Sequence, residues 1–147
     1  MYWPARFRKI NILINEILKF QHDLQFEKNI NYSCNLILID NKLIKKINNK
    51  FRNLNTVTDV LTFASETKFK GKKKDKICDI FFSAEIISKD SKKNGINFYD
   101  HLAHLIVHSF LHINGFVHNK YNDFIKMKNI EIKILKKLGI SNPYLQN

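Results

Sequence analysis

The sequence predicts one α+β domain, and three observations support this prediction. Apolar residues recur at three- and four-residue steps in several segments of ten or more residues, as they do in amphipathic helices. Shorter segments between them are rich in isoleucine, valine, threonine and phenylalanine, which favour strands. The 147 residues, 44% of them hydrophobic, are enough to bury a core, and no repeat or linker divides them.

Five helices are expected. The first has Ile10, Leu13, Ile14 and Ile17 on one face, with polar residues between them. The last is followed by Gly139, a residue type that suits the position just after a helix end. The expected helices span about residues 7–26, 41–50, 83–94, 100–110 and 123–138.

Three strands are expected, at about residues 32–39, 56–63 and 77–82. The segment 68–76 contains six lysines, one glycine and no aliphatic residue, so it should be an exposed loop. The second and third strands would then form a hairpin joined by this long loop.

The charge of the chain points to a polyanionic partner. It has 25 lysines and arginines against 13 acidic residues, a formal net charge of +12. RNA or DNA is therefore the first candidate and an anionic membrane surface the second. Cys34 and Cys78 form no CxxC pair, as expected for a reduced cytosolic protein. No apolar stretch approaches the roughly 18–20 residues that span a bilayer, so we expect a soluble, cytoplasmic protein without a membrane partner. The sequence leaves the oligomeric state open, with a monomer as the first expectation.

The histidines indicate a metal site. Five of the six lie between His101 and His118, and three of them have the spacing H-x3-H-x5-H. On a helix, His108 and His112 would share one face, and Gly115 would let the chain turn back and bring His118 to the same ion. Three imidazoles with a fourth position open are typical of a catalytic zinc site, so we expect one divalent ion per chain, with zinc as the first candidate among the several first-row ions that such a site accepts.

Other interpretations of the histidines remain open. The three could be satisfied separately, two in the core and one in a loop, although their shared spacing favours the metal. His104 should support the ligands from behind or lie buried, and His101 should lie near the helix start. Ser109 stands where the metalloprotease motif H-E-x-x-H has glutamate, so a general base would come from elsewhere.

The lysine-rich segment and one arginine are candidates for RNA contact. Lys72, Lys73 and Lys74 could follow a phosphate backbone, or could simply be solvated. Arg52 precedes the second expected strand, and a guanidinium there could stabilise charge on a phosphate near a metal. From composition alone, Arg52 would be an ordinary surface arginine.

These residues resemble the motifs of a known family. Residues 108–118, H-S-F-L-H-I-N-G-F-V-H, resemble H-G-x-L-H-L-x-G-Y-D-H of the YbeY family, the metal-dependent endoribonucleases of rRNA maturation. Residues 48–52 and 58–63, N-N-K-F-R and T-D-V-L-T-F, resemble that family's L-N-x-x-Y-R and T-D-V-L-S-F. Residues 78–80 and 142–144 correspond to its G-D-I and D-P-Y. The matches keep the family's order over roughly residues 30–145.

The resemblance implies a small mixed sheet flanked by helices, with the metal site on a central histidine-bearing helix and the loop after it. It implies a zinc-type ion on His108, His112 and His118, cleavage of single-stranded RNA, and processing of the 3′ end of 16S rRNA with the small ribosomal subunit and its assembly factors. Arg52 matches the family's functional arginine and becomes a candidate for catalysis and RNA binding. His108 is a catalytic candidate as well as a ligand.

Four departures from the family pattern bear on the expected site and its surroundings. Ser109 and Cys78 replace glycines, Val57 replaces a proline, and Val117 replaces the aspartate before the last histidine. That aspartate could position a ligand or water, so its loss bears on activity. Cys78 could instead be a fourth metal ligand, although a buried strand cysteine is the commoner case.

Three functions follow from these residues. The first is a metal-dependent endoribonuclease. The second is a catalytically weak or inactive ribosome-associated RNA-binding assembly factor whose metal site is structural. The third is a metal hydrolase of another substrate, such as peptides, which the absence of glutamate at position 109 and the +12 charge disfavour.

Overall fold

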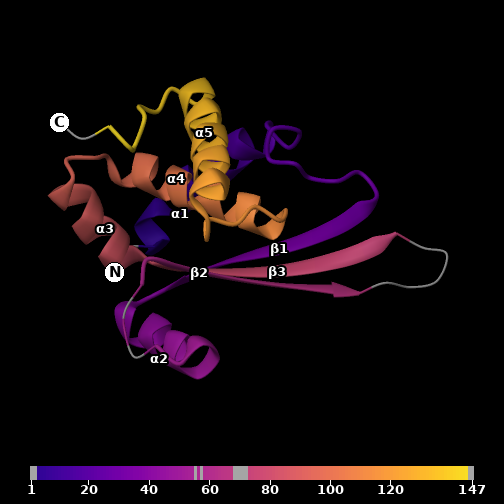
Figure 1. The fold of residues 1–147 in the computed structure, drawn as a ribbon. Coiled ribbons are helices and arrows are strands. Elements are labelled where there is room, and N and C mark those ends of the chain that lie inside the picture. The colour runs from indigo at the N-terminus through magenta and orange to yellow at the C-terminus, as the bar shows by residue number, and fades with distance from the viewer. Residues whose placement is uncertain (1–2, 55, 57, 68–72, 146–147) are drawn as a thin grey trace. The chain divides into compact units, whose positions relative to one another are not determined.

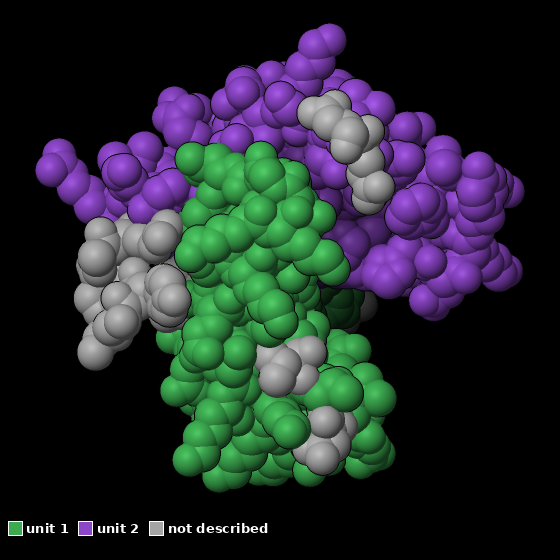
Figure 2. All heavy atoms as spheres, turned by 90° about the vertical axis from the view of Figure 1, so that its left-hand side faces the viewer, with its two compact units in different colours: residues 1–5, 27–98 green, residues 6–26, 99–147 purple. Residues whose placement is uncertain are grey.

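The computed structural model describes residues 3–54, 56, 58–67 and 73–145. The chain forms two compact units, shown in different colours in Figure 2. Residues 1–5 and 27–98 form one, here called the sheet unit. Residues 6–26 and 99–147 form the other, here called the helical unit. Each is described by itself below.

The sheet unit contains a three-stranded mixed sheet. Its strands are β1 (Ile30–Ile39), β2 (Val60–Thr67) and β3 (Lys74–Ser83), in the order β1-β3-β2 (Figure 1). β3 pairs in parallel with β1 and antiparallel with β2. The expectations of a mixed sheet and of a hairpin between the second and third strands are therefore confirmed.

The second strand begins later than the sequence suggested, and a buried side chain explains why. Asn48 is only 3% exposed, and its Nδ2 donates to the carbonyl and hydroxyl oxygens of Thr56 at 3.1 and 3.3 Å. A buried amide needs such partners, so Thr56 is held beside the preceding helix instead of entering the sheet. The expected strand over residues 56–63 was therefore wrong at its start and four residues short at its end.

The lysine-rich segment is partly strand. β2 continues to Thr67 and β3 starts at Lys74, so the expectation of a loop over residues 68–76 was wrong for its last three residues. Glu66 lies across from Lys76 in the antiparallel register, and its carboxylate also meets Lys74, with N···O distances of 3.5 and 2.5 Å. Opposite charges facing one another across strands stabilise this end of the hairpin.

Two helices belong to the sheet unit, α2 (Asn41–Arg52) and α3 (Ala84–Lys93). Each begins with a side-chain cap: Asp40 accepts from the Leu43 amide at 2.8 Å, and Ser83 accepts from the Ile86 amide at 3.4 Å. Asn53, the residue that caps the C-terminus of α2, takes a left-handed conformation (φ 56°). Because α2 runs two residues beyond the expected end, Arg52 is its last residue and not part of a polar link.

The helical unit is built from α1 (Trp3–Leu18), whose first residues belong to the sheet unit, α4 (Phe98–Ile113) and α5 (Tyr121–Lys137). α1 is shorter than expected because turns replace the helix after Leu18. These turns bring the carbonyl of the buried Leu24 to Asn114, whose Nδ2 donates to it at 2.8 Å. They also place Phe26 edge-on against Phe110, with ring centroids 5.5 Å apart.

The five helices and three strands of the described residues confirm the α+β class. The expectation of one domain over residues 1–147 stays a prediction. In the described part of the chain, no helix combines the length and the hydropathy needed to cross a bilayer.

Candidate metal centre

Three histidines converge within the helical unit because a tight turn follows the end of α4. The helix carries His108 and His112 one turn apart and stops at Ile113. Gly115 follows with φ +96°, a conformation that residues with a Cβ rarely adopt, and the Phe116 amide donates back to the Leu111 carbonyl at 3.0 Å. This turn returns the chain, so that His118 joins the pair as the spacing predicted.

The ring nitrogens of these histidines are close enough to share one ion. One ligand atom from each of the three lies within 4.8 Å of the others. The Nε2 atoms of His108 and His112 are 3.0 Å apart. The ring centroid of His118 lies 5.4 Å from that of His108 and 4.8 Å from that of His112. Tetrahedral zinc with bonds of about 2.0–2.1 Å would separate two nitrogens by about 3.3 Å, so small ring movements suffice.

The hydrogen-bond partners of the Nδ1 atoms determine whether the Nε2 atoms of His108 and His112 are protonated. Nδ1 of His112 lies 2.9 Å from the Phe116 carbonyl, which can only accept, so Nδ1 holds the proton. Nδ1 of His108 lies 2.5 Å from a carboxylate oxygen of Glu131, which has the same effect. In the neutral rings both Nε2 atoms therefore present lone pairs to each other, an arrangement that a cation between them would stabilise.

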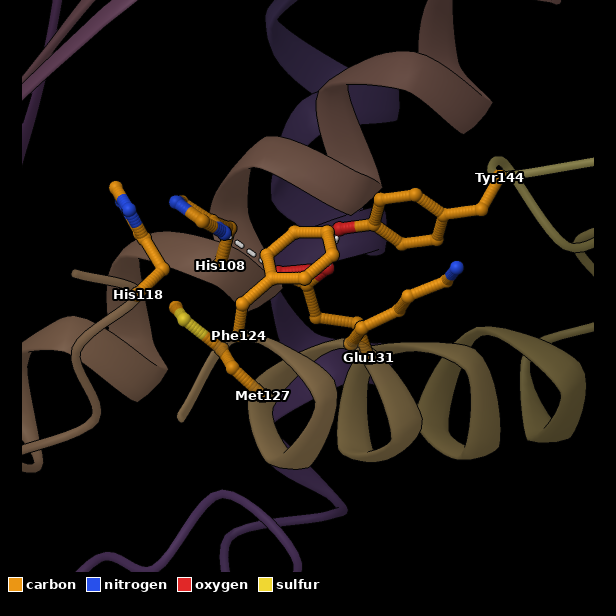
Figure 3. A pocket seen from close by; sticks show the side chains of 7 residues that line it. His108, His118, Phe124, Met127, Glu131 and Tyr144 are labelled. Atoms are coloured by element: carbon orange, nitrogen blue, oxygen red, sulfur yellow. Dashed lines mark hydrogen bonds and ion pairs between the residues drawn. The ribbon is translucent and has the colours of Figure 1, made fainter. Parts of the chain in front are cut away.

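Glu131 on α5 is the residue to which three side chains around the candidate ligands donate hydrogen bonds. Its side chain is fully buried, and it accepts from His108 and from the Tyr144 hydroxyl (Figure 3). It also accepts from His104 Nε2 at 3.0 Å. Burial alone would raise the pKa of Glu131, but the hydrogen bonds from the two histidines and from Tyr144 hold it at about 2. The carboxylate is thus ionised at neutral pH. Its charge can offset part of the charge of a bound cation.

His112 is the most strongly perturbed ligand. Burial, followed by the nearby His108 and His118, lowers the pKa of His112 to about 4. A ring that stays neutral at pH 7 is already in the form that binds a metal, since a protonated imidazole has no free lone pair. The donor set therefore fits a divalent ion of zinc type. We expect three protein ligands and a fourth position for a further ligand.

Sequence reasoning missed two residues of this site, Glu131 and Tyr144. Each had a signal in the sequence. Glu131 is an acidic residue on the apolar face of the last helix, between the buried Met127 and the buried Ile134 and Leu135. Tyr144 lies in the N-P-Y segment, which resembles a family motif, but that resemblance assigned no function to the tyrosine. A lone charge on an apolar face is costly unless it is paired, so it should have pointed to a buried partner.

His104 and His101 lie upstream on the same helix. His104 contacts Glu131 and the Tyr144 hydroxyl, at 3.0 and 3.3 Å, and so lies behind the ligands and not among the three. Its side chain is 16% exposed. His101 lies in the first turn of α4, as expected for a residue near the helix start.

The described candidates for RNA contact, Arg52, Lys73 and Lys74, lie in the sheet unit. Arg52 is exposed; its Nη2 donates to the Thr62 carbonyl at 3.3 Å, and its guanidinium lies over the Phe63 ring at 5.5 Å. Lys73 is exposed, Lys74 pairs with Glu66, and Lys72 lies outside the described residues. The roles assigned to Arg52 and these lysines stay predictions.

The departures from the family motif have different surroundings. Ser109 is buried, and its hydroxyl donates to the Leu105 carbonyl at 2.8 Å, so it is satisfied within its own helix. Val117 is 46% exposed beside His118. Cys78 is buried in β3 in register with Cys34 of β1, and its role as a fourth ligand stays a prediction. Val57 lies outside the described residues.

Comparison with known proteins identifies the family. The family model described as Endoribonuclease YbeY matches residues 5–139. The chain belongs to the endoribonuclease YbeY family. Its relatives include the Endoribonuclease YbeY of Pelagibacter ubique, 35% identical, with 91% of this chain and 88% of that protein aligned. That of Anaplasma phagocytophilum is 32% identical over 97% of this chain and 91% of its own. That of Polynucleobacter asymbioticus is 43% identical over 69% and 63%.

A solved structure also resembles this YbeY-family chain. A solution structure of a Thermotoga maritima protein aligns with a TM-score of 0.56 over 92% of this chain and 93% of its own, at 24% identity. At that identity the likeness concerns the fold alone. The resemblance seen in the sequence is thus confirmed, and with it the expected class of enzyme, an endoribonuclease family.

Proposed function

We propose that this protein is a metal-dependent endoribonuclease that cuts single-stranded RNA, processes the 3′ end of 16S rRNA and works in the cytoplasm with the small ribosomal subunit. The observation that supports it is the group of three histidines, in which His108 and His112 each have an acceptor at Nδ1 and bring their Nε2 atoms to within 3.0 Å of each other. Membership of an endoribonuclease family supports RNA as the substrate. The +12 charge favours the same polyanion.

A divalent ion at this site would supply Lewis acidity toward a phosphoryl oxygen or a water molecule. The residues of the chain do the rest. Glu131 keeps the proton of His108 on Nδ1, and the Phe116 carbonyl does the same for His112. Arg52, whose guanidinium can make two parallel hydrogen bonds to a phosphate, would stabilise the charge that develops during cleavage.

The first test compares His112→Ala with His22→Ala. His22 is exposed and outside the group of three, so it is the matched control. Zinc content and cleavage of a fluorescent single-stranded RNA are measured on the same preparations. We expect His112→Ala to lose both and His22→Ala to keep both. Cleavage by a metal-free His112→Ala protein would contradict the proposal.

Arg52 is tested by replacement with lysine, which keeps the charge and loses the planar pair of donors. We expect unchanged zinc content and a fall in kcat of about tenfold or more, because one charge-stabilising group is removed. A kcat equal to that of the wild type would remove Arg52 from the mechanism while leaving the metal site untouched.

The alternative, an assembly factor with little or no cleavage, is favoured by one observation. Val117 stands beside His118 where the family signature has aspartate. We expect Val117→Asp to raise cleavage if the site is only weakened by this change. If wild-type protein binds zinc and RNA, and neither it nor Val117→Asp cuts RNA, the assembly-factor function holds.

A further inference from the structure

A pocket opens beside the three histidines in the helical unit. Its volume is about 160 Å³, and its lining comes from α4, the following loop, α5 and the C-terminal segment (Figure 3). The residues that line it are His108, His118, Phe124, Met127, Lys128, Glu131 and Tyr144. An apolar cavity of about 150 Å³ accepts one benzene ring, so this pocket has the size for one six-membered ring.

The walls suit a flat ring. Phe124 and Tyr144 stand edge to face, with centroids 6.2 Å apart and planes at 88°, so two aromatic surfaces meet at a corner. Met127, 1% exposed, adds a polarizable thioether side chain to the lining. Both aromatic side chains are partly exposed, which leaves them accessible to a ligand.

A cation lies at the same place. Lys128 Nζ is 4.8 Å from the centroid of the Tyr144 ring and 5.9 Å from that of Phe124, so the two rings position it. No carboxylate in the described part of the chain lies within ion-pair distance of Lys128. Lys133 and Lys137 of the same helix, in contrast, are both paired with Asp23. The Lys128 ammonium is therefore available to an anionic ligand.

Glu131 is the one carboxylate among the residues that line the pocket, and a divalent cation held by the three histidines would offset its charge. Its oxygens already accept from His104, His108 and the Tyr144 hydroxyl. With the histidine nitrogens directed to Glu131 and to the proposed metal, the polar group left for a ligand is the Lys128 ammonium. A ring and a negative charge close together are what a nucleotide offers, and His108 and His118 put that nucleotide beside the metal-binding atoms.

We propose that this pocket binds one nucleotide of the RNA next to the bond that is cut. A pyrimidine base lies against Phe124 and Tyr144, and Lys128 contacts the adjoining phosphate. Stacking on aromatic rings together with a nearby lysine is a common way to hold a single strand. The size of the pocket favours uracil or cytosine over a two-ring purine. The inference rests on the proposed function for its ligand, RNA.

The test measures equilibrium binding of fluorescein-labelled 2′-O-methyl hexauridylate to the metal-loaded full chain by anisotropy, with the integrity of the RNA checked afterwards on a gel. Phe124→Ala and Lys128→Ala should each weaken binding about tenfold, as expected for one lost base contact or one lost phosphate contact. The matched controls lie on the same helix and outside the pocket: Tyr121→Ala, an aromatic residue 77% exposed, and Lys126→Ala, an exposed lysine. Both should stay within about twofold of wild type, and all variants should keep the zinc content of wild type.

Two further ligands distinguish the contribution of the base to binding from that of the phosphate. Inorganic polyphosphate has no base, so Lys128→Ala should weaken its binding and Phe124→Ala should leave it unchanged. Hexaadenylate should bind wild type more weakly than hexauridylate, and this difference should shrink in Phe124→Ala. Equal loss of both oligonucleotides and polyphosphate in Phe124→Ala would overturn the base pocket, as would a Phe124→Ala protein that binds hexauridylate like Tyr121→Ala.

The outcome is distinguishable from failure of the proposed function. If wild type binds hexauridylate through Phe124 and cuts no RNA, the pocket stands and the nuclease function fails. If wild type cuts RNA and Phe124→Ala has the same KM and the same binding, the nuclease function stands and the pocket proposal is wrong.

Discussion

Replacing Glu131 with glutamine would keep the shape of a buried side chain and change what it can accept. Three donors point at the carboxylate, from His104, His108 and Tyr144. An amide has one oxygen that accepts and one nitrogen that only donates, so the three donors cannot all be satisfied. The mismatch is relieved if His108 moves its proton to Nε2. That tautomer has no lone pair at Nε2 for a metal.

The magnitudes follow from these contacts. Loss of a partner that orients a histidine ligand lowers metal affinity about 10–100-fold, which corresponds to about 1.4–2.7 kcal/mol. The metal-free protein should also lose about 1–3 kcal/mol in the free energy of unfolding, because hydrogen bonds to an ionised carboxylate are replaced by weaker ones to a neutral amide. Tyr144→Phe removes one donor and leaves both histidines paired to the carboxylate, so its loss of metal affinity should be smaller.

The assay is a zinc titration against a coloured chelator for wild type, Glu131→Gln, Tyr144→Phe and Glu16→Gln, with urea unfolding in the presence of EDTA. Glu16 is an exposed glutamate of α1 that pairs with Lys19, so Glu16→Gln controls for loss of a carboxylate as such. Zinc affinity of Glu131→Gln within about twofold of wild type would refute the reasoning, since it would mean that Glu131 does not fix the ring of His108.

Two further predictions concern charges and thiols. Hydrogen bonds from Lys137 and Lys133 lower the pKa of Asp23, so this interaction stabilises the protein above the usual pKa of 3.8 and is lost as pH falls through the lower folded value. Asp23→Asn should therefore lower the free energy of unfolding by about 0.5–1 kcal/mol at pH 7 and not near pH 2 in urea titrations; equal losses at both pH values would contradict this. Burial raises the pKa of Cys34 to about 12, so at pH 8 it should react with iodoacetamide about 1000-fold more slowly in the native protein than in urea, and equal rates would contradict this.

The sequence predicted each element of the fold, and tertiary contacts decided their ends. Thr56, Val57 and Thr58 have the composition of a strand, yet Thr56 is held by the buried Asn48 and the strand starts at Val60. Lys74 and Lys76 look like loop residues, yet Glu66 across the hairpin pairs with both and lets the strand continue. In each case the deciding partner lies on another element, where periodicity along the chain carries no information.

The candidate site likewise has one part that the sequence predicts and one part that depends on contacts between distant elements. The three histidines and the turn at Gly115 lie within eleven consecutive residues, so local geometry, one helical turn and the turn that follows the helix, brings them together. Glu131 and Tyr144 reach the site from 23 residues beyond His108 and from the C-terminal segment, 40 residues beyond His104. No local pattern indicates that α5 turns this particular face toward the histidines. Only the cost of burying a carboxylate without partners could have suggested it.

The same geometry bears on Val117, the most consequential departure from the family motif. His108 and His112 already have acceptors at Nδ1, one a carboxylate and one a carbonyl, so an aspartate at position 117 is not needed to orient either ring. His118 is exposed, and within the described residues no hydrogen bond holds its ring. An aspartate at position 117 would interact with His118 itself, or with water or substrate beside it. The change to valine should therefore affect the rate of cleavage more than the affinity for the metal, which the Val117→Asp comparison can separate.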